Sequence, residues 1–118
     1  MFSSLTNIEE IDLSNFDTSL VTNMNSMFSG CSSLRSIKLL NVNTSQVEDM
    51  QKLFNNCRSL TSLDLSSFNT SILLRADYMF YSCQKLDFLN ISSFNISSVI
   101  SMGSMFQGCN SLNYLNIA

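Results

Sequence analysis

Four cysteines recur at one spacing, and the thiol is the most reactive side chain in this sequence. Cys31, Cys57, Cys83 and Cys109 follow one another every 26 residues, and the chain contains no histidine. Without imidazole, a Ser–His or Cys–His relay and an HExxH zinc site are excluded. With one cysteine in each repeat, the four thiols would also lie in a line along the stack instead of converging on a metal ion. We therefore expect buried, unreactive thiols and neither a metal nor a cofactor, with disulfides between neighbouring copies as the alternative.

Carboxylates are the remaining candidates for acid–base chemistry. Glu9 with Glu10, and Asp49 with Asp77, fall where no pocket is evident from the sequence, so ordinary solvated charge is the favoured interpretation and we expect no enzyme activity. The net charge of -3 and six scattered basic residues supply no electrostatic footprint for nucleic acid. No apolar run approaches the ~18 residues of a membrane span.

Four Asn residues begin N-x-[ST] sequons, which accept glycans in a eukaryotic secretory pathway. They are Asn43, Asn69, Asn90 and Asn95. Asn, Thr and Ser are also the residues that a turn and a helix N-cap require, so the sequons have a structural explanation as well. We favour Asn43 and Asn69 as glycosylation sites over Asn90, which falls within the expected sheet.

These residues belong to an internal repeat of 26 residues, present in about four and a half copies without insertion or deletion. Leu or Ile keeps the same step in several columns, one of which is Ile11, Ile37, Leu63, Leu89 and Leu115. A Phe column runs through Phe28, Phe54, Phe80 and Phe106. Such strict register predicts a stack of identical structural units. The chain contains 23 Ser and 14 Asn but only 13% charged residues, so we expect hydroxyl and amide groups to form most of its polar surface.

The hydrophobic spacing changes within each copy. Leu63-x-Leu65 alternates with the period of a half-buried strand. Val47, Met50, Leu53–Phe54 and Cys57 have the spacing of an amphipathic helix, and Ser45 with Glu48 would form its capping box. The expected fold is therefore an α/β solenoid, with a parallel sheet on one face and helices on the other.

The repeat unit resembles a known family. The segment from Cys57 through Leu60, Leu63, Leu65 and Phe68, followed by Met79-Phe80-x-x-Cys83, is similar to the BspA-type leucine-rich repeat of surface proteins in mycoplasmas, oral bacteria and protists. This resemblance covers the whole chain. It implies a leucine-rich-repeat solenoid used for adhesion or protein binding, often outside the cell or on its surface, but no particular ligand.

The outward residues of the expected strands form the candidate binding face. Phe88 and Tyr114 would lie side by side on the sheet, flanked by Asn90 and Asn116, and would suit a protein or a sugar ring. Cover by a further repeat or a neighbouring molecule is the alternative. Asp12, Lys38 and Asp64 alternate in sign and predict a modest ion ladder.

We expect one domain over residues 1–118. Its repeats are 5–30, 31–56, 57–82, 83–108 and a partial 109–118, with 1–4 ending a preceding repeat. Neither end has a polar capping repeat, which indicates a fragment of a longer array or self-association through the ends. The leading functional hypothesis is a scaffold that binds a protein or glycan. The alternative is a structural protein that stacks end to end into a filament or coat.

Overall fold

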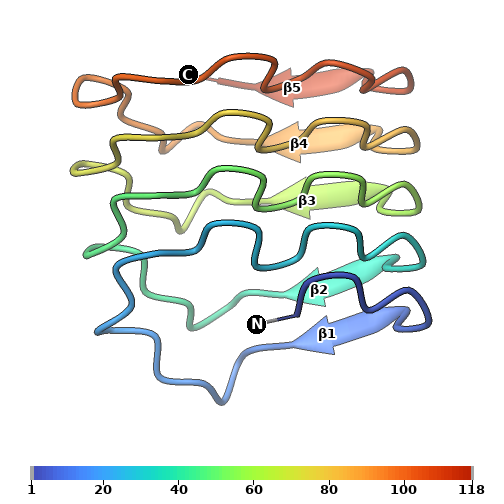
Figure 1. Cartoon of the computed structure of the whole chain (residues 1–118), viewed down its shortest axis with the longest axis horizontal. Coiled ribbons are helices and arrows are strands. Elements are labelled where there is room, and N and C mark those ends of the chain that lie inside the picture. Colours follow the sequence, from blue (N-terminus) through green and yellow to red (C-terminus); the bar gives the residue numbers. More distant parts are fainter. Residues whose placement is uncertain (1, 118) are drawn as a thin grey trace.

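The computed structural model describes residues 2–117. The chain winds into stacked coils, each carrying one short strand, and the strands form a single column (Figure 1). They are β1 (Glu10–Asp12), β2 (Ser36–Lys38), β3 (Ser62–Asp64), β4 (Phe88–Asn90) and β5 (Tyr114–Asn116). The predicted 26-residue solenoid-like repeat is confirmed. Met1, which the sequence places in phase with Met27, lies outside the described residues.

The strands pair in parallel with residues 26 apart opposite one another. Ile11 pairs with Ile37 in the first sheet, while Leu63, Leu89 and Leu115 pair in succession in the second. The two sheets are β1–β2 and β3–β4–β5, so β2 and β3 are not paired. The column of strands is therefore interrupted once.

The predicted helical face is wrong. Residues 2–117 contain no helix. They therefore hold no helix that is long and apolar enough to cross a membrane. The return segment of each coil is instead a run of tight turns, which we call the return side. Its backbone N–H groups form two kinds of hydrogen bond. Those of Met50 and Lys52 donate to carbonyl oxygens of the next coil, at Arg75 and Asp77, whereas that of Leu53 closes a turn by donating to Met50 O.

Left-handed residues explain why this segment is not helical. Lys52 and Asn56 have φ values of 56° and 61°, and φ is also positive at the corresponding positions of other coils. A right-handed helix does not accommodate such residues every few positions. Apolar residues three and four apart come to one side here because each tight turn advances the chain by three residues. The expected capping box is also absent: Ser45 N–H donates to Asn43 Oδ1, and Glu48 N–H to Thr22 O.

The core lies between the strands and the return side, and aromatic rings run through it. Phe54 is fully buried, with its ring centroid 5.4 Å from that of Phe28 and 6.0 Å from that of Phe80, and all three rings are nearly parallel. Beside this stack, the buried Thr44 hydroxyl donates to Asn69 O and accepts from Asn69 N–H. Apolar packing and backbone hydrogen bonds therefore hold the coils in register together.

Candidate binding face

The outward side of β4 and β5 carries two stacked aromatic rings. The ring centroids of Phe88 and Tyr114 are 4.8 Å apart and the rings are within 3° of parallel. Phe88 is half-buried, whereas the side chain of Tyr114 is 51% exposed. The pair arises because side chains alternate along a strand: Leu89, which follows Phe88, is fully buried, and Tyr114 lies in register with Phe88 on the opposite, outward side. An exposed flat aromatic surface of this kind suits stacking against a planar group or a sugar ring.

The outward polar residues at the strand ends shape the turns that follow. Asn90 Oδ1 accepts a hydrogen bond from Ser92 N–H at 3.0 Å, and Asp64 Oδ1 accepts one from Ser66 N–H at 2.9 Å. Asn116 is half-buried and lies in register with Asn90. These Asx turns end β3 and β4 and bend the chain away from the sheet. The predicted binding residues on β4 and β5 are thus brought together on one surface.

The predicted ion ladder does not extend over three strands. Asp12 lies in register with Lys38. Hydrogen bonds from Ser14 lower the pKa of Asp12, and the charge of Lys38 lowers it less. Asp64 belongs to the other sheet, and Lys38 forms no ion pair with it in the described chain. Hydrogen bonds from Ser66 lower the pKa of Asp64. Neither step of the predicted Asp–Lys–Asp ladder forms an ion pair in the described chain, and the second step, from Lys38 to Asp64, also crosses the break between the two sheets.

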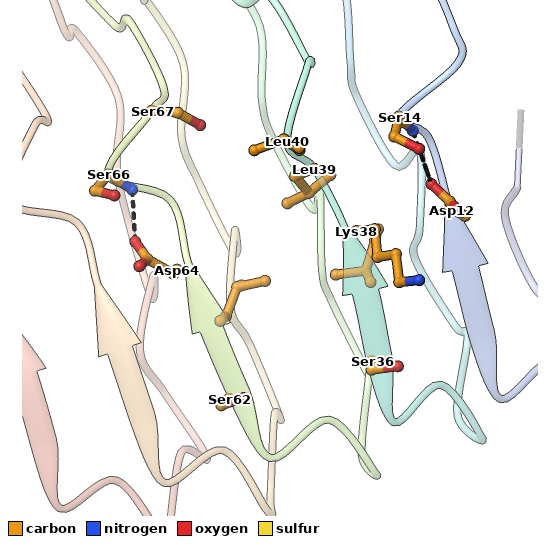
Figure 2. Close-up of a pocket in the computed structure, with 12 residues that line it drawn as sticks. Asp12, Ser14, Ser36, Lys38, Leu39, Leu40, Ser62, Asp64, Ser66 and Ser67 are labelled. Carbon is orange, nitrogen blue, oxygen red and sulfur yellow. Dashed lines mark hydrogen bonds between the residues drawn. The ribbon is translucent and has the colours of Figure 1, made fainter.

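A cleft of about 690 Å³ takes the place of that second step. It is lined by residues of β2 and β3 and by Asp12 and Ser14 of the first coil, and Figure 2 shows the Lys38 side chain directed toward β1 rather than toward Asp64. Ile37 and Leu63 also line it. Its volume falls within the ~300–1,000 Å³ of typical ligand pockets. No ion pair joins Lys38 to Asp64 across this cleft in the described chain.

The sequence holds a signal for this cleft that we did not use. The last strand residue is Asp or Asn in every coil except the second, where it is Lys38. A Lys side chain has no acceptor, so it cannot form the Asx turn that follows the other strands. Leu40 also replaces the Ser found at positions 14, 66 and 92 and is 80% exposed. The turn after β2 instead forms a hydrogen bond with the first coil, in which Asn41 Nδ2 donates to Ser14 O. This bond ties coil two to coil one.

The sequon residues lie at the corner where each strand leads into the return side. Asn43, Asn69 and Asn95 are exposed, and the Oδ1 of each accepts from the N–H of the Ser two residues later. Asn90 is half-buried. Turn formation accounts for all four residues, so glycosylation at these positions stays a prediction.

All four cysteines are free, so the disulfide alternative is wrong. Each Sγ donates to the carbonyl oxygen of the Phe 29 residues earlier, as Cys57 does to Phe28 O at 3.2 Å and Cys83 to Phe54 O at 3.1 Å. Burial raises the pKa of Cys57 to about 12 and also raises that of Cys83. These thiols stay protonated and fill the core.

The carboxylates considered for catalysis hold neighbouring coils together. Asp49 is buried, and its Oδ2 lies 3.9 Å from Arg75 Nη1 in an ion pair. Asp77 accepts hydrogen bonds from Ser101 Oγ, from Gln51 Nε2 at 2.8 Å and from Gly103 N–H at 2.7 Å. These bonds lower the pKa of Asp77, so it is held ionised. Glu9 and Glu10 are exposed.

A second aromatic pair was missed by the sequence analysis. The ring centroids of Tyr78 and Tyr81 are 5.6 Å apart in an edge-to-face arrangement, and Lys52 Nζ lies 6.0 Å from the Tyr78 ring. The pair lies on the return side, away from the strands. The sequence alone does not reveal this pair, because the contact depends on the tight turns of the return side rather than on the predicted helix.

Comparison with known proteins identifies a family but no characterised relative. No curated protein and no solved structure matches the chain. Residues 1–117 match the model of a family described as "Mycoplasma protein of unknown function, DUF285". The match spans nearly the whole repeat array, and the chain therefore belongs to the DUF285 family.

Proposed function

We propose that this chain is a non-catalytic scaffold that binds a protein or a glycan through its strand side, outside the cell or at its surface. The resemblance to BspA-type leucine-rich repeats supports this proposal, because those repeats serve adhesion and protein binding. A solenoid also builds an extended binding surface by stacking copies of one short repeat.

The observation that carries the proposal is the stacked pair Phe88–Tyr114. The equivalent outward positions in the first three coils are Glu10, Ser36 and Ser62, all of them polar. The strand side therefore changes from polar to aromatic at β4 and β5. Rigid aromatic side chains lose little conformational entropy on binding and give a large contact area, so they commonly anchor interfaces.

The test is a double variant, Phe88→Ser with Tyr114→Ser, which gives these strands the residue that β2 and β3 already carry. Binding is measured on a panel of immobilised oligosaccharides and purified extracellular proteins. We expect at least a tenfold loss for any ligand captured by the native chain, because truncating an anchor residue costs about 2 kcal/mol or more. Unchanged capture would argue against this site.

The matched control is Tyr78→Ser with Tyr81→Ser. It removes the other aromatic pair, on the return side, and Ser already stands at the equivalent positions 26 and 29. This variant should keep full binding. Equal losses in both variants would indicate general damage to the fold.

The alternative of end-to-end stacking into a filament or coat stays a prediction. Large apolar side chains are exposed in the first and last described coils, among them Phe16 at 48% and Ile117 at 65%. Electron microscopy of the purified chain tests this alternative, since single particles at micromolar concentration would contradict it.

A further inference from the structure

The Phe88 ring has one face that neither an aromatic ring nor a cation of the described chain covers. Tyr114 covers the other face, since the two rings are parallel and their strands are neighbours. The open face is directed toward β3, where the residue in register with Phe88 is Ser62. The one cation over an aromatic ring among the described residues is Lys52, which lies over Tyr78 on the return side.

The space above Ser62 has the thickness of one planar group. Neighbouring strands of a sheet lie about 4.8 Å apart. The ring centroids of Phe88 and Tyr114, on neighbouring strands, are also 4.8 Å apart. A third ring in this series would therefore stand over β3. Ser62 occupies that position with a short, exposed side chain, so a planar group of a partner can lie there in contact with the Phe88 ring.

Asp64 supplies a negative charge beside this space. It follows Ser62 by two residues on β3, so both side chains project from the outward side of the sheet. Figure 2 shows its carboxylate on the side of β3 that faces β4. Hydrogen bonds from Ser66 lower the pKa of Asp64, so the carboxylate is charged at neutral pH. No described residue forms an ion pair with it.

The charge of the strand side favours a cationic partner. Lys38 is the one basic residue among the outward strand residues, and its side chain is directed toward β1 and away from Asp64 (Figure 2). The other charged outward residues, Glu10, Asp12 and Asp64, are all acidic. The whole chain also has a net charge of -3. Complementary charge steers a partner toward such a surface and disfavours acidic partners.

We propose that the strand side binds an arginine side chain of a partner protein, whose guanidinium stacks on the open face of Phe88 above Ser62 and donates to the Asp64 carboxylate. A guanidinium is planar, stacks on aromatic faces and carries its N–H donors in its own plane, so one group meets both the ring and the carboxylate. A lysine ammonium has no planar face, and a sugar or a neutral ring leaves Asp64 without a counter-charge. This inference rests on the proposed binding role and names the chemistry of the partner.

The experiment is an NMR titration of the chain with isotope-labelled phenylalanine. The probe is the blocked tripeptide Gly-Arg-Gly, and the matched controls carry lysine or citrulline in its place. Citrulline keeps the planar shape of arginine and lacks its charge. The arginine peptide should shift the ring signals of Phe88, which are assigned by their absence in Phe88→Ser. The lysine and citrulline peptides should bind about two- to fivefold more weakly, because each has lost the planar group or the charge.

Asp64→Asn tests the role of the charge. The new side chain keeps an acceptor for Ser66 N–H, as Asn90 does at the end of β4, so the turn is preserved. Binding of the arginine peptide should weaken about two- to fivefold. Asp12→Asn is the matched control, because Asp12 accepts from Ser14 N–H in the same way but lies on β1. This variant should bind the peptide as the native chain does.

Four results would overturn the proposal. The first is no shift of the Phe88 signals at about 50 mM arginine peptide, where a fragment of this size should bind. The second is equal binding of the arginine and citrulline peptides, which would mean that charge plays no part. The third is a shift of the same signals by a methyl glycoside, which would make a sugar the occupant. The fourth is a shift that grows with protein concentration without peptide, which would indicate a second copy.

Failure of this inference is distinguishable from failure of the proposed function. Capture that is lost in the Phe88→Ser, Tyr114→Ser variant while the arginine peptide has no effect would keep the binding role and remove the arginine. Unchanged capture in that variant would argue against the aromatic pair as a whole.

Discussion

The strand side and the return side of the same coils behave differently at the junction of coils two and three. On the return side, backbone bonds, stacked Phe rings and the Thr column continue without interruption. On the strand side, pairing stops between β2 and β3 and resumes between β3 and β4. The return side thus carries the structure through several independent contacts per coil. The strand side has only three residues per strand, so we expect it to be sensitive to a single changed turn.

Removing one ring from the Phe stack should have the largest effect on this arrangement. Phe54→Ala deletes a fully buried side chain between Phe28 and Phe80 and should lower the free energy of unfolding by about 3–5 kcal/mol. Urea unfolding followed by circular dichroism measures it. Leu40→Ala truncates a side chain that is 80% exposed and should change stability by less than about 0.5 kcal/mol. Similar losses in the two variants would contradict a dominant core on the return side.

The Thr column should contribute the next largest effect. Thr44→Val keeps the shape of the side chain but leaves the N–H and carbonyl of Asn69 without their partner. Because these hydrogen bonds are only partly buried, we expect a loss of about 1 kcal/mol for each bond removed. Thr22→Val at an exposed position is the control and should be nearly neutral. A Thr44→Val chain as stable as the control would mean that the Asn69 groups find water instead.

The buried thiols should make stability fall at high pH. The ordinary pKa of a Cys thiol is near 9.0, and that of Cys57 in the folded chain is about 12. Above pH 9 the unfolded chain loses this proton while the folded chain keeps it, so stability is full below pH 9 and declines between pH 9 and 12. The decline approaches about 1.4 kcal/mol per pH unit for one such thiol.

Urea unfolding at pH 8 and pH 10 measures this decline. Cys57→Ala should reduce it relative to the native chain, while Cys83 and the remaining thiols keep part of it. An unchanged slope in Cys57→Ala would mean that Cys57 ionises in the folded state, in contradiction to its burial.

The sequence predicted the features that depend on repetition and missed those that depend on departures from it. Columns such as Leu63, Leu89 and Leu115 fixed the parallel register, because identical side chains pack best when stacked. The helix prediction failed because hydrophobic spacing alone does not reveal φ at Lys52 or Asn56. The aromatic pair was predicted from its column, since outward alternation in a strand is reliable.

The cleft was not predicted because Lys38 was interpreted as a charge between two carboxylates. In the structure, the outward side chains at the ends of β1, β3 and β4 accept hydrogen bonds from the N–H two residues later. Asp12, Asp64 and Asn90 each form an Asx turn, and Lys38 does not. We therefore expect that Lys at this position changes which backbone groups pair.

The smallest predicted effect tests this cause directly. Lys38→Asn with Leu40→Ser gives coil two the Asx turn of coil four and should join β2 to β3. Each hydrogen bond gained stabilises the chain by about 0.5–1.5 kcal/mol, and exchange of the Leu39 amide should slow to the rate of Leu65. The reverse variant, Asn90→Lys with Ser92→Leu, should loosen β4 from β5 and speed exchange at Ile91, whose N–H donates to Asn116 O. If Leu39 exchanges as fast in the first variant as in the native chain, packing of the coils rather than turn chemistry separates the two sheets.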